Sequence, residues 1–143
     1  MMDKGELLPE QLVADIPTTI AGYTPENYDE TYNGAVPAAR ALARSLNIPA
    51  VRLLQQYGLQ RFRDELTNFQ IRDIRYSADH YGLSLIVGGA EANLWDLCKT
   101  YSGLAGTLNH YHESSGAYFK NEFVAPIMYS TEKVDFGIKI KQK

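Results

Sequence analysis

The sequence lacks the features that define several classes of protein. It has one cysteine, Cys98, so it cannot form an internal disulfide. No apolar run approaches the roughly 20 residues that cross a membrane as a helix. Lys and Arg together number 14 against 17 Asp and Glu, the net charge is -3, and no basic stripe is present. The composition therefore predicts a globular chain with no nucleic-acid partner.

What is present is enough for one domain with a core, because the chain has 143 residues. Ten tyrosines are many for this length, and we expect them to pack at the edges of the core rather than to stack on sugars. Residues 15 to 36 are rich in Pro, Gly, Asn, Asp and Thr, which predicts an ordered but irregular segment. Its Tyr23, Tyr28 and Tyr32 are expected to hold this segment against the helices behind it.

Two short helices are predicted on either side of residue 48. Pro37 suits the first turn of a helix, whose inward stripe follows the spacing i, i+3, i+4 and i+7. The stripe consists of Ala38, Ala41, Leu42 and Ser45. Pro49 disfavours helical geometry at Ile48, which predicts a break just before it. A second helix then ends at Gly58. Its apolar face consists of Val51, Leu54 and Tyr57.

Ser45 and Asn47 therefore lie at a junction between helices, and two interpretations of the pair are open. In the first, Ser45 ends one helix and Asn47 caps the next, as polar residues commonly do. In the second, the break lets both side chains turn into one cleft, although residues two apart do not share a face within a helix. A hydroxyl and a carboxamide presented together would then form a small polar site.

The middle of the chain gives weaker patterns. Residues 59 to 66 predict a short amphipathic helix with a charged face exposed to solvent. Its apolar positions are Leu59, Phe62 and Leu66. Residues 70 to 80 are polar and predict a loop. Residues 83 to 87 form a short apolar run between glycines, which fits either a buried strand or an extended lining segment.

A second clear helix is predicted over residues 93 to 106, with Asn93 as its cap. Its continuous apolar stripe consists of Leu94, Leu97, Cys98, Tyr101, Leu104 and Ala105. Cys98 is accordingly expected to be an inert thiol in the core. Residues 107 to 121 predict a loop. Residues 134 to 141 alternate strictly between apolar and polar types and predict one strand, whose pairing partner is open.

Three patterns imitate functional motifs and are set aside. Residues 130 to 133 have the Ser-x-x-Lys spacing of a serine nucleophile and its lysine but lack a surrounding apolar helix, so we expect an exposed loop. Lys99-Thr100-Tyr101 has tyrosine where a Lys-Thr-Gly motif needs glycine, and it lies in a predicted helix. His110 and His112 lack a third histidine or a cysteine pair, which argues against a zinc site. We therefore predict no metal site and no cofactor.

The order of several short motifs is more specific than any one of them. They are Tyr23-x-Pro25-x-Asn27-Tyr28-Asp29, Gly34-x-Val36, Ala41-Leu42-x-x-Ser45-Leu46-Asn47-Ile48-Pro49-Ala50-Val51, Tyr81-Gly82-Leu83-Ser84-Leu85-x-x-Gly88-Gly89-Ala90-Glu91 and Leu94-Trp95-x-Leu97-x-x-x-Tyr101-x-x-Leu104-Ala105. This series closely resembles the transpeptidase domain of class A penicillin-binding proteins, and its details are most similar to the 1C type. The resemblance covers roughly residues 5 to 110.

The resemblance implies a fold class that is mainly α with a few short strands. The complete family domain packs a helical cluster against a five-stranded antiparallel sheet, and this chain resembles the helical portion of that α/β fold. Residues 1 to 143 are thus expected to be a partial transpeptidase domain. Two family motifs have no counterpart here: the nucleophile segment and the Lys-Thr/Ser-Gly strand. The apolar surface that the remainder of the domain would cover is expected to be exposed and to favour self-association.

The resemblance also implies a mechanism for the family. A serine attacks a D-Ala carbonyl of a peptidoglycan stem peptide, or a β-lactam, and an amine resolves the acyl-enzyme into a cross-link. Ser45 would relay a proton to the leaving nitrogen between two lysines. Asn47 would hold the first lysine and bind the substrate backbone. Both lysines belong to the motifs without a counterpart, so we predict that this chain alone neither cross-links stem peptides nor is acylated by penicillin.

The function expected from the resemblance is therefore that of a fragment of a peptidoglycan D,D-transpeptidase that carries the Ser-x-Asn motif only. The parent protein would act at the periplasmic face of the bacterial inner membrane, and this chain itself would be soluble. The resemblance also implies a glycosyltransferase domain in the parent protein. An alternative from another class is a non-catalytic binding or scaffolding module derived from the same domain. A third is a small metal-binding protein that uses the histidines, for which zinc would have to raise the melting temperature.

Overall fold

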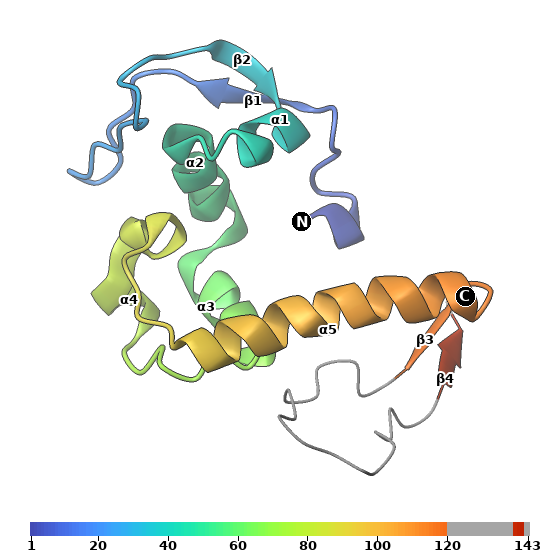
Figure 1. Ribbon diagram of the computed structural model, residues 1–143. Coiled ribbons are helices and arrows are strands. Elements are labelled where there is room, and N and C mark those ends of the chain that lie inside the picture. The colour runs from blue at the N-terminus through green and yellow to red at the C-terminus, as the bar shows by residue number, and fades with distance from the viewer. Residues whose placement is uncertain (120–138, 142–143) are drawn as a thin grey trace. The chain divides into compact units, whose positions relative to one another are not determined.

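The computed structural model describes residues 1–119 and 139–141, which divide into two compact units (Figure 1). The first unit comprises Met1–Glu65 with Arg75–Glu91. The second comprises Leu66–Ile74 and the chain from Ala92 onward. Each unit has its own arrangement of helices and one pair of strands, so each is described by itself.

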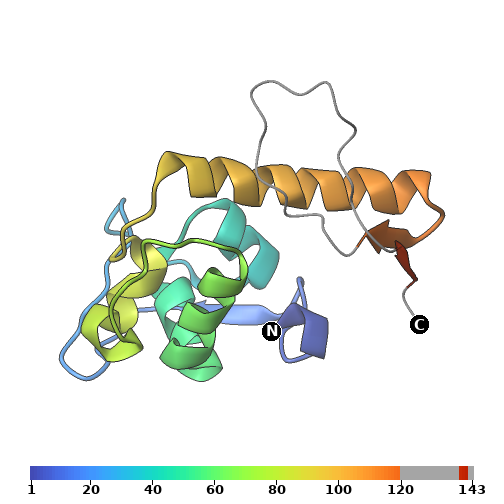
Figure 2. The same ribbon diagram turned by 90° about the horizontal axis from the view of Figure 1, so that it is seen from below.

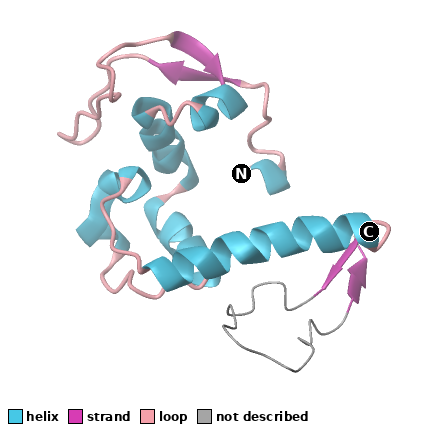
Figure 3. Ribbon diagram, viewed as in Figure 1, coloured by secondary structure: helices cyan, strands magenta, loops and turns pink. Residues whose placement is uncertain are grey.

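The first unit begins with a single 3₁₀ turn, η1 (Met2–Lys4), and two antiparallel strands follow, β1 (Leu12–Asp15) and β2 (Gly34–Pro37). These strands form the two edges of the segment that the sequence predicts to be irregular, and the segment between them is irregular as expected (Figure 3). The expected role of its tyrosines is wrong for two of them. Tyr28 and Tyr32 are exposed, because the segment is held by polar contacts instead.

Two predicted helices are present as α1 (Ala38–Ala43) and α2 (Asn47–Tyr57), and α3 (Leu59–Asn68) continues from them. The core residues of α2 are Ile48, Val51 and Leu54, each with at most 1% of its surface exposed. Gly58 ends α2 with a positive φ of 97°, as predicted. The break lies earlier than expected, because α2 begins at Asn47 and accommodates Pro49 in its first turn, where no intrahelical N–H bond is lost.

The inward stripe predicted for α1 is only half correct. Ala38 and Ala41 are buried, whereas Leu42 and Ser45 are exposed. The helix ends at Ala43, and the backbone at Ser45 turns into the left-handed region with a φ of 54°. Helical spacing therefore no longer applies at i+7, and the side chain of Ser45 leaves the buried face.

Residues 75 to 91 fold differently from the sequence prediction of a loop followed by a strand or lining segment. They form a short helix, α4 (Ala78–Tyr81), and a 3₁₀ helix, η2 (Gly82–Val87), which packs against α2. The side chain of Ser77 caps α4 by accepting a hydrogen bond from the N–H of His80. A 3₁₀ helix satisfies the backbone locally, so this apolar run needs no partner strand.

The second unit is organised around α5 (Leu94–Glu113), a continuous 20-residue helix (Figure 2). The prediction of a helix capped by Asn93 is confirmed, but α5 continues seven residues beyond the predicted end at Gly106. The prediction of a loop from residue 107 is wrong up to Glu113, because the helix continues through Gly103 and Gly106 without a break. After α5, β3 (Ala117–Phe119) pairs antiparallel with β4 (Lys139–Lys141), within the strand that was predicted. Residues 134 to 138 of that prediction lie outside the described residues.

The predicted apolar stripe of α5 is present in sequence but is not buried. Leu94 is 76% exposed and Tyr101 is 72% exposed. Cys98 is also exposed, so its prediction as a core thiol is wrong. The described residues thus include an apolar helix face that no described segment covers. The fold class is confirmed: the described chain is mainly α with four short strands in two pairs. None of its described helices is apolar and long enough to cross a bilayer.

Candidate active site

The two candidate residues lie at a sharp turn between α1 and α2. The N–H of Ser45 donates to the carbonyl of Leu42 (2.9 Å), and the N–H of Leu46 donates to that of Ala41 (3.0 Å). This pair of bonds is a Schellman motif, in which the residue in the left-handed conformation is usually glycine. Here that residue is Ser45, with a φ of 54°. A side chain at such a position strains the backbone, and strain of this kind clusters at functional sites.

The start of α2 is capped by a residue that is distant in sequence. The Oδ1 atom of Asn27 accepts hydrogen bonds from the N–H groups of Asn47 (3.0 Å) and Ile48 (3.3 Å). The side chain of Asn47 does not cap α2, because its Nδ2 donates to the carbonyl of Glu26 (2.8 Å). The interpretation of Asn47 as an N-cap is therefore wrong: Asn47 is already helical, and Leu46 is the capping position.

Asp15 at the end of β1 holds Asn27 from the other side. Its carboxylate accepts from Asn27 Nδ2 (2.7 Å) and from both the backbone N (2.9 Å) and the Nδ2 (2.6 Å) of Asn33. Asp15 is fully buried, which opposes its ionisation, but these hydrogen bonds outweigh burial and keep the pKa of Asp15 below its ordinary value of 3.8. Arg44 extends the network by donating to Asn33 Oδ1 (2.7 Å).

Ser45 and Asn47 line the same hollow, which has a volume of about 340 Å³ and lies entirely within the first unit. Its walls come from α1, the start of α2 and the end of η2. The lining residues are Ala38, Ala41, Leu42, Ser45, Leu46, Asn47, Pro49, Ala50, Leu53, Ile86 and Val87. Ser45 and Asn47 are thus the polar side chains of a largely apolar concavity, which is the usual composition of a ligand site. The predicted lining role of the 83–87 segment is present, since Ile86 and Val87 line the hollow, but the segment is a 3₁₀ helix and not extended.

The chemistry available in this hollow is limited. The hydroxyl of Ser45 can both donate and accept a hydrogen bond, and the carboxamide of Asn47 offers both kinds of bond without charge. No lysine, histidine or carboxylate is among the lining residues that the structure describes. A serine needs a neighbouring base to become a nucleophile, so the described walls can bind and relay protons but cannot activate a nucleophile.

Sequence patterns alone did not identify Asn27 and Asp15 as part of this site. Asn27 belongs to the motif series that carries the family resemblance, but no spacing rule connects it with Asn47, twenty residues away. Asp15 is the first residue of the segment predicted to be irregular, where an acidic residue is unremarkable. Because both contacts are tertiary, the only signal was an asparagine in a loop rich in turn-forming residues.

The other candidate motifs contribute no described residue to the lining of the hollow. Lys99-Thr100-Tyr101 is helical, as predicted, and Thr100 Oγ1 donates to the carbonyls of Phe69 (3.0 Å) and Asp96 (2.9 Å). His110 and His112 lie in the last turn of α5 rather than in a loop. Among the described residues no cluster of three or more His, Cys, Asp or Glu side chains could hold a metal. The Ser-x-x-Lys sequence at residues 130 to 133 lies outside the described residues.

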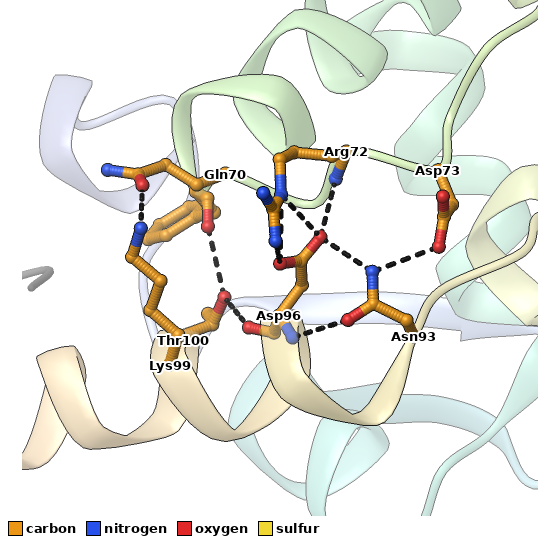
Figure 4. A network of polar contacts seen from close by, with 8 residues as sticks. Gln70, Arg72, Asp73, Asn93, Asp96, Lys99 and Thr100 are labelled. Atoms are coloured by element: carbon orange, nitrogen blue, oxygen red, sulfur yellow. Dashed lines mark hydrogen bonds and ion pairs between the residues drawn. The ribbon is translucent and has the colours of Figure 1, made fainter. Parts of the chain in front are cut away.

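A second polar network lies at the start of α5 (Figure 4). Unlike the network around Asn27, it is centred on an ion pair, between Arg72 and Asp96. The carboxylate of Asp96 is 1% exposed and accepts from Arg72 through Nη2 (2.7 Å), Nε (3.1 Å) and the backbone N (3.0 Å). Hydrogen bonding by Arg72 is the main reason that the pKa of Asp96 lies far below its ordinary value. Lys99 Nζ donates to Gln70 Oε1 nearby. These contacts join the 66–74 segment to α5, and the one charge pair among them is Arg72 with the buried carboxylate of Asp96, which indicates a structural role.

Comparison with known proteins gives relatives of one kind. No family model matches the chain. Penicillin-binding protein 1C of Escherichia coli is 38% identical over 104 residues, which is 73% of this chain and 14% of that protein. Penicillin-binding protein 1F of Bacillus subtilis is 30% identical over 129 residues, which is 89% of this chain and 16% of that protein. The chain thus spans about one seventh of the length of these curated relatives.

Solved structures give the same result for the fold. The penicillin-binding protein PonA1 from Mycobacterium tuberculosis is similar over 73% of this chain and 30% of its own, with a TM-score of 0.63 and 22% identity. Penicillin-binding protein 1A from Haemophilus influenzae is similar over 66% of this chain and 14% of its own, with a TM-score of 0.55 and 24% identity. At these identities the similarity establishes a shared fold.

Proposed function

Because this chain belongs to the class A penicillin-binding proteins, as its resemblance predicted, we propose that it forms the Ser45–Asn47 side of a peptidoglycan D,D-transpeptidase site. Residues 1 to 143 are then a portion of a transpeptidase domain. The observation that carries the proposal is geometric: Ser45 and Asn47 border one hollow at a helix break that is fixed by a Schellman turn and by the Asn27 cap.

In the proposed reaction Ser45 is a proton relay and not the nucleophile. A serine outside the described hollow attacks the D-Ala carbonyl, the peptide C–N bond breaks, and the leaving nitrogen must gain a proton. The hydroxyl of Ser45 can pass on such a proton because it accepts one hydrogen bond while donating another. Asn47 binds the neighbouring lysine and the substrate backbone. Both lysines come from segments for which this chain has no counterpart.

It follows that the 143-residue chain by itself is not acylated by β-lactams. Intact-mass spectrometry after incubation with benzylpenicillin tests this statement, and the expected result is an unchanged mass. A stoichiometric adduct would contradict it and would require a nucleophile within the chain. Mapping such an adduct by proteolysis would then identify the reacting serine, with the 130–133 sequence as the first position to inspect.

A chimera tests the role of Ser45 directly. The matched 104-residue segment of the Escherichia coli penicillin-binding protein 1C is replaced by the corresponding residues of this chain, and acylation by a labelled penicillin is followed over time. Ser45→Ala is expected to slow acylation about 100-fold, the usual contribution of a positioned proton-transfer group. Ser102→Ala, an exposed serine on α5, is the matched control and leaves the rate unchanged. Equal rates for Ser45→Ala and the unsubstituted chimera would contradict the proposal.

The rest of the proposal concerns partners and location. The substrates are stem peptides of peptidoglycan, β-lactams bind as their mimics, and the reaction transfers an acyl group in cell-wall synthesis. The protein that carries this segment acts at the periplasmic face of the inner membrane. Fractionation of cells that produce the protein from its native gene tests the location, because a cytoplasmic pool would be incompatible with access to peptidoglycan.

A second candidate function, a non-catalytic binding module, is favoured by one observation on α5. Six large apolar side chains with alternating spacings of three and four are all at least 36% exposed. They are Leu94, Leu97, Tyr101, Leu104, Leu108 and Tyr111. This is the spacing of a helix–helix seam, and it suits self-association. Sedimentation should show a mass that rises with concentration, and Leu104→Glu should abolish the rise where Ser102→Glu does not. A monomer at every concentration would contradict self-association.

A further inference from the structure

We propose that Asn27 is a positioning residue, which fixes where α2 begins and thereby how Ser45 and Asn47 border the hollow. This inference rests on the proposed function, because it concerns the same site. Asn27 is 4% exposed and does not line the hollow. Its influence therefore has to act through the start of α2, to which its side chain is directly bonded.

The carboxamide of Asn27 uses its full hydrogen-bonding capacity. Its Oδ1 accepts from the N–H groups of Asn47 and Ile48, and its Nδ2 donates to Asp15 Oδ1 (2.7 Å) and to the carbonyl of Thr31 (2.8 Å). An asparagine side chain offers two donors and two acceptor sites, and all four are occupied here. Substitution by any other residue type therefore breaks at least one of these contacts.

No residue next to the helix start performs this task. The capping position is Leu46, whose side chain has no acceptor and is buried against Val36 and Ala41. Serine, threonine, aspartate or asparagine would be usual there, since the first N–H groups of a helix need an acceptor. Leucine at this position serves the apolar core of the first unit instead, and the acceptor comes from the 26–27 segment.

The same segment also holds the side chain of Asn47. The carbonyl of Glu26 accepts from Asn47 Nδ2, while Asn27 accepts from the backbone N–H of Asn47. Two adjacent residues thus determine both the backbone and the side-chain position of the candidate substrate-binding residue. Asp15 fixes the orientation of the Asn27 carboxamide. The carboxylate oxygen of Asp15 can accept only from Asn27 Nδ2, so a rotation that brought Asn27 Oδ1 to this position would place two acceptors in contact.

Amide hydrogen exchange on the complete 143-residue chain tests the positioning directly. In Asn27→Ala the amides of Asn47 and Ile48 lose their acceptor and should exchange about 10-fold faster, relative to the amide of Leu54 in the same helix. Asn27→Ser, which keeps a short acceptor, should fold even if the alanine variant does not and should show a smaller increase. Asn93→Ala, which removes the cap of α5, is the matched control and should leave Asn47 and Ile48 unchanged.

An exchange of the two partners provides a rescue. In the double variant Asp15→Asn with Asn27→Asp, a carboxylate caps α2 and an amide donates to it, while the carbonyl of Thr31 loses its donor. Much of the slow exchange of Asn47 and Ile48 should therefore return. Asn27→Asp alone places two buried carboxylates in contact and should not restore it. A purely steric role for Asn27 predicts the same exchange rates in the single and double variants, and that result would overturn the proposal.

The chimera described above separates this proposal from the proposed function. Asn27→Ala should slow penicillin acylation in the chimera, and it should have little further effect once Ser45 is alanine. Unchanged exchange at Asn47 and Ile48 overturns the positioning role whatever the acylation rate. Faster exchange with normal acylation in Asn27→Ala, while Ser45→Ala is slow, also overturns it. If neither substitution affects acylation but exchange is faster, the proposed function fails and the positioning of α2 stands.

Discussion

The two longest helices among the described residues, α5 and α2, each begin with an asparagine side chain that caps them, but the two caps are assembled in different ways. In α5 the capping bond is local: Asn93 Oδ1 accepts from the N–H of Asp96 (2.8 Å). The Nδ2 of Asn93 donates to the carboxylate of Asp96 and to that of Asp73, 20 residues upstream (2.9 Å each). In α2 the capping bond is remote: Asn27 caps the helix from 20 residues upstream, and Asp15 holds its amide. Each cap is an asparagine oriented by an aspartate.

The difference between the two caps indicates which part of the candidate site depends on tertiary structure. A local cap forms as soon as its helix forms, because cap and N–H groups are three residues apart. A remote cap forms only when β1, the 26–33 segment and α2 have come together. The capping bond of α5 is thus a property of a short sequence, although Arg72 and Asp73 support it from a distance. The capping bond of α2, beside Ser45, depends entirely on the tertiary fold of the first unit.

The largest loss of stability should come from removing Asp15, the carboxylate that supports the remote cap on α2. Asp15→Ala leaves the amides of Asn27 and Asn33 and a backbone N–H without their acceptor in a buried place, which should lower the free energy of unfolding by about 3 kcal/mol. Urea denaturation followed by circular dichroism measures it. Asp29→Ala, which removes an exposed carboxylate of the same segment, is the control and should cost less than about 0.5 kcal/mol.

The caps themselves should differ in the same direction. Asn27→Ala removes four hydrogen bonds at a buried position and should lower the free energy of unfolding by about 2 kcal/mol, whereas Asn93→Ala should cost about 1 kcal/mol, the usual value for a helix cap. Denaturation of both variants under one set of conditions tests the difference. Equal losses would mean that the remote cap contributes no more than the local one, and the comparison would then fail.

The predictable part of the fold follows the same division between local and tertiary contacts. Asn93 was recognised as a cap from its place before an apolar helical pattern, and Gly58 as a helix stop from the pattern that precedes it. Both depend on neighbours in sequence. Asn27 and Asp15 could not be recognised in this way, because the bonds that join them to each other and to the start of α2 span 12 to 21 residues. Strands β1 and β2 were not predicted, because each has only four residues and the two pair across a separation of about 20 residues.

The candidate site shows, within a few residues, what the sequence could predict and what it could not. The sequence predicted a junction between helices at Ser45–Asn47 and left open whether both side chains face one cleft; the structure has the break and a hollow lined by both residues. It placed Ser45 on a buried stripe, however, because helical spacing was extended through a position where the backbone turns left-handed. On α5, periodicity identified an apolar stripe but could not tell that no described segment buries it.

Acid should separate the two supporting carboxylates. The pKa values of Asp15 and Asp96 are both below the ordinary value of 3.8, Asp96 by far the more because a guanidinium group binds it. A lowered pKa in the folded state stabilises the protein above the pKa of the unfolded chain, and this stability is lost as the pH falls through the folded value. Below pH 4 the carboxyl of Asp15 should therefore gain a proton before that of Asp96. Carboxyl-detected NMR titration measures both, and the reverse order would contradict the assignment.

The smallest effect concerns strain, which only one of the two helix starts carries. Ser45 occupies a left-handed position that favours glycine, whereas Asn93 has an ordinary extended backbone with a φ of -87°. Ser45→Gly should therefore raise the free energy of unfolding by about 0.5–1 kcal/mol, since relief of strain exceeds the entropy that glycine loses on folding. Ser102→Gly, in the interior of α5, should lower it by a similar amount.

The sign of the Ser45→Gly effect bears on why a serine is found at this turn. If the variant is more stable in thermal denaturation while acylation of the chimera is slowed, the strained serine is explained by its hydroxyl in the hollow and not by folding. If Ser45→Gly is instead destabilising, the side chain contributes to the fold of the turn, and its presence no longer points to a functional site. The first outcome means that the cap on α2 positions a functional hydroxyl, and the second means that the cap serves only to stabilise the helix.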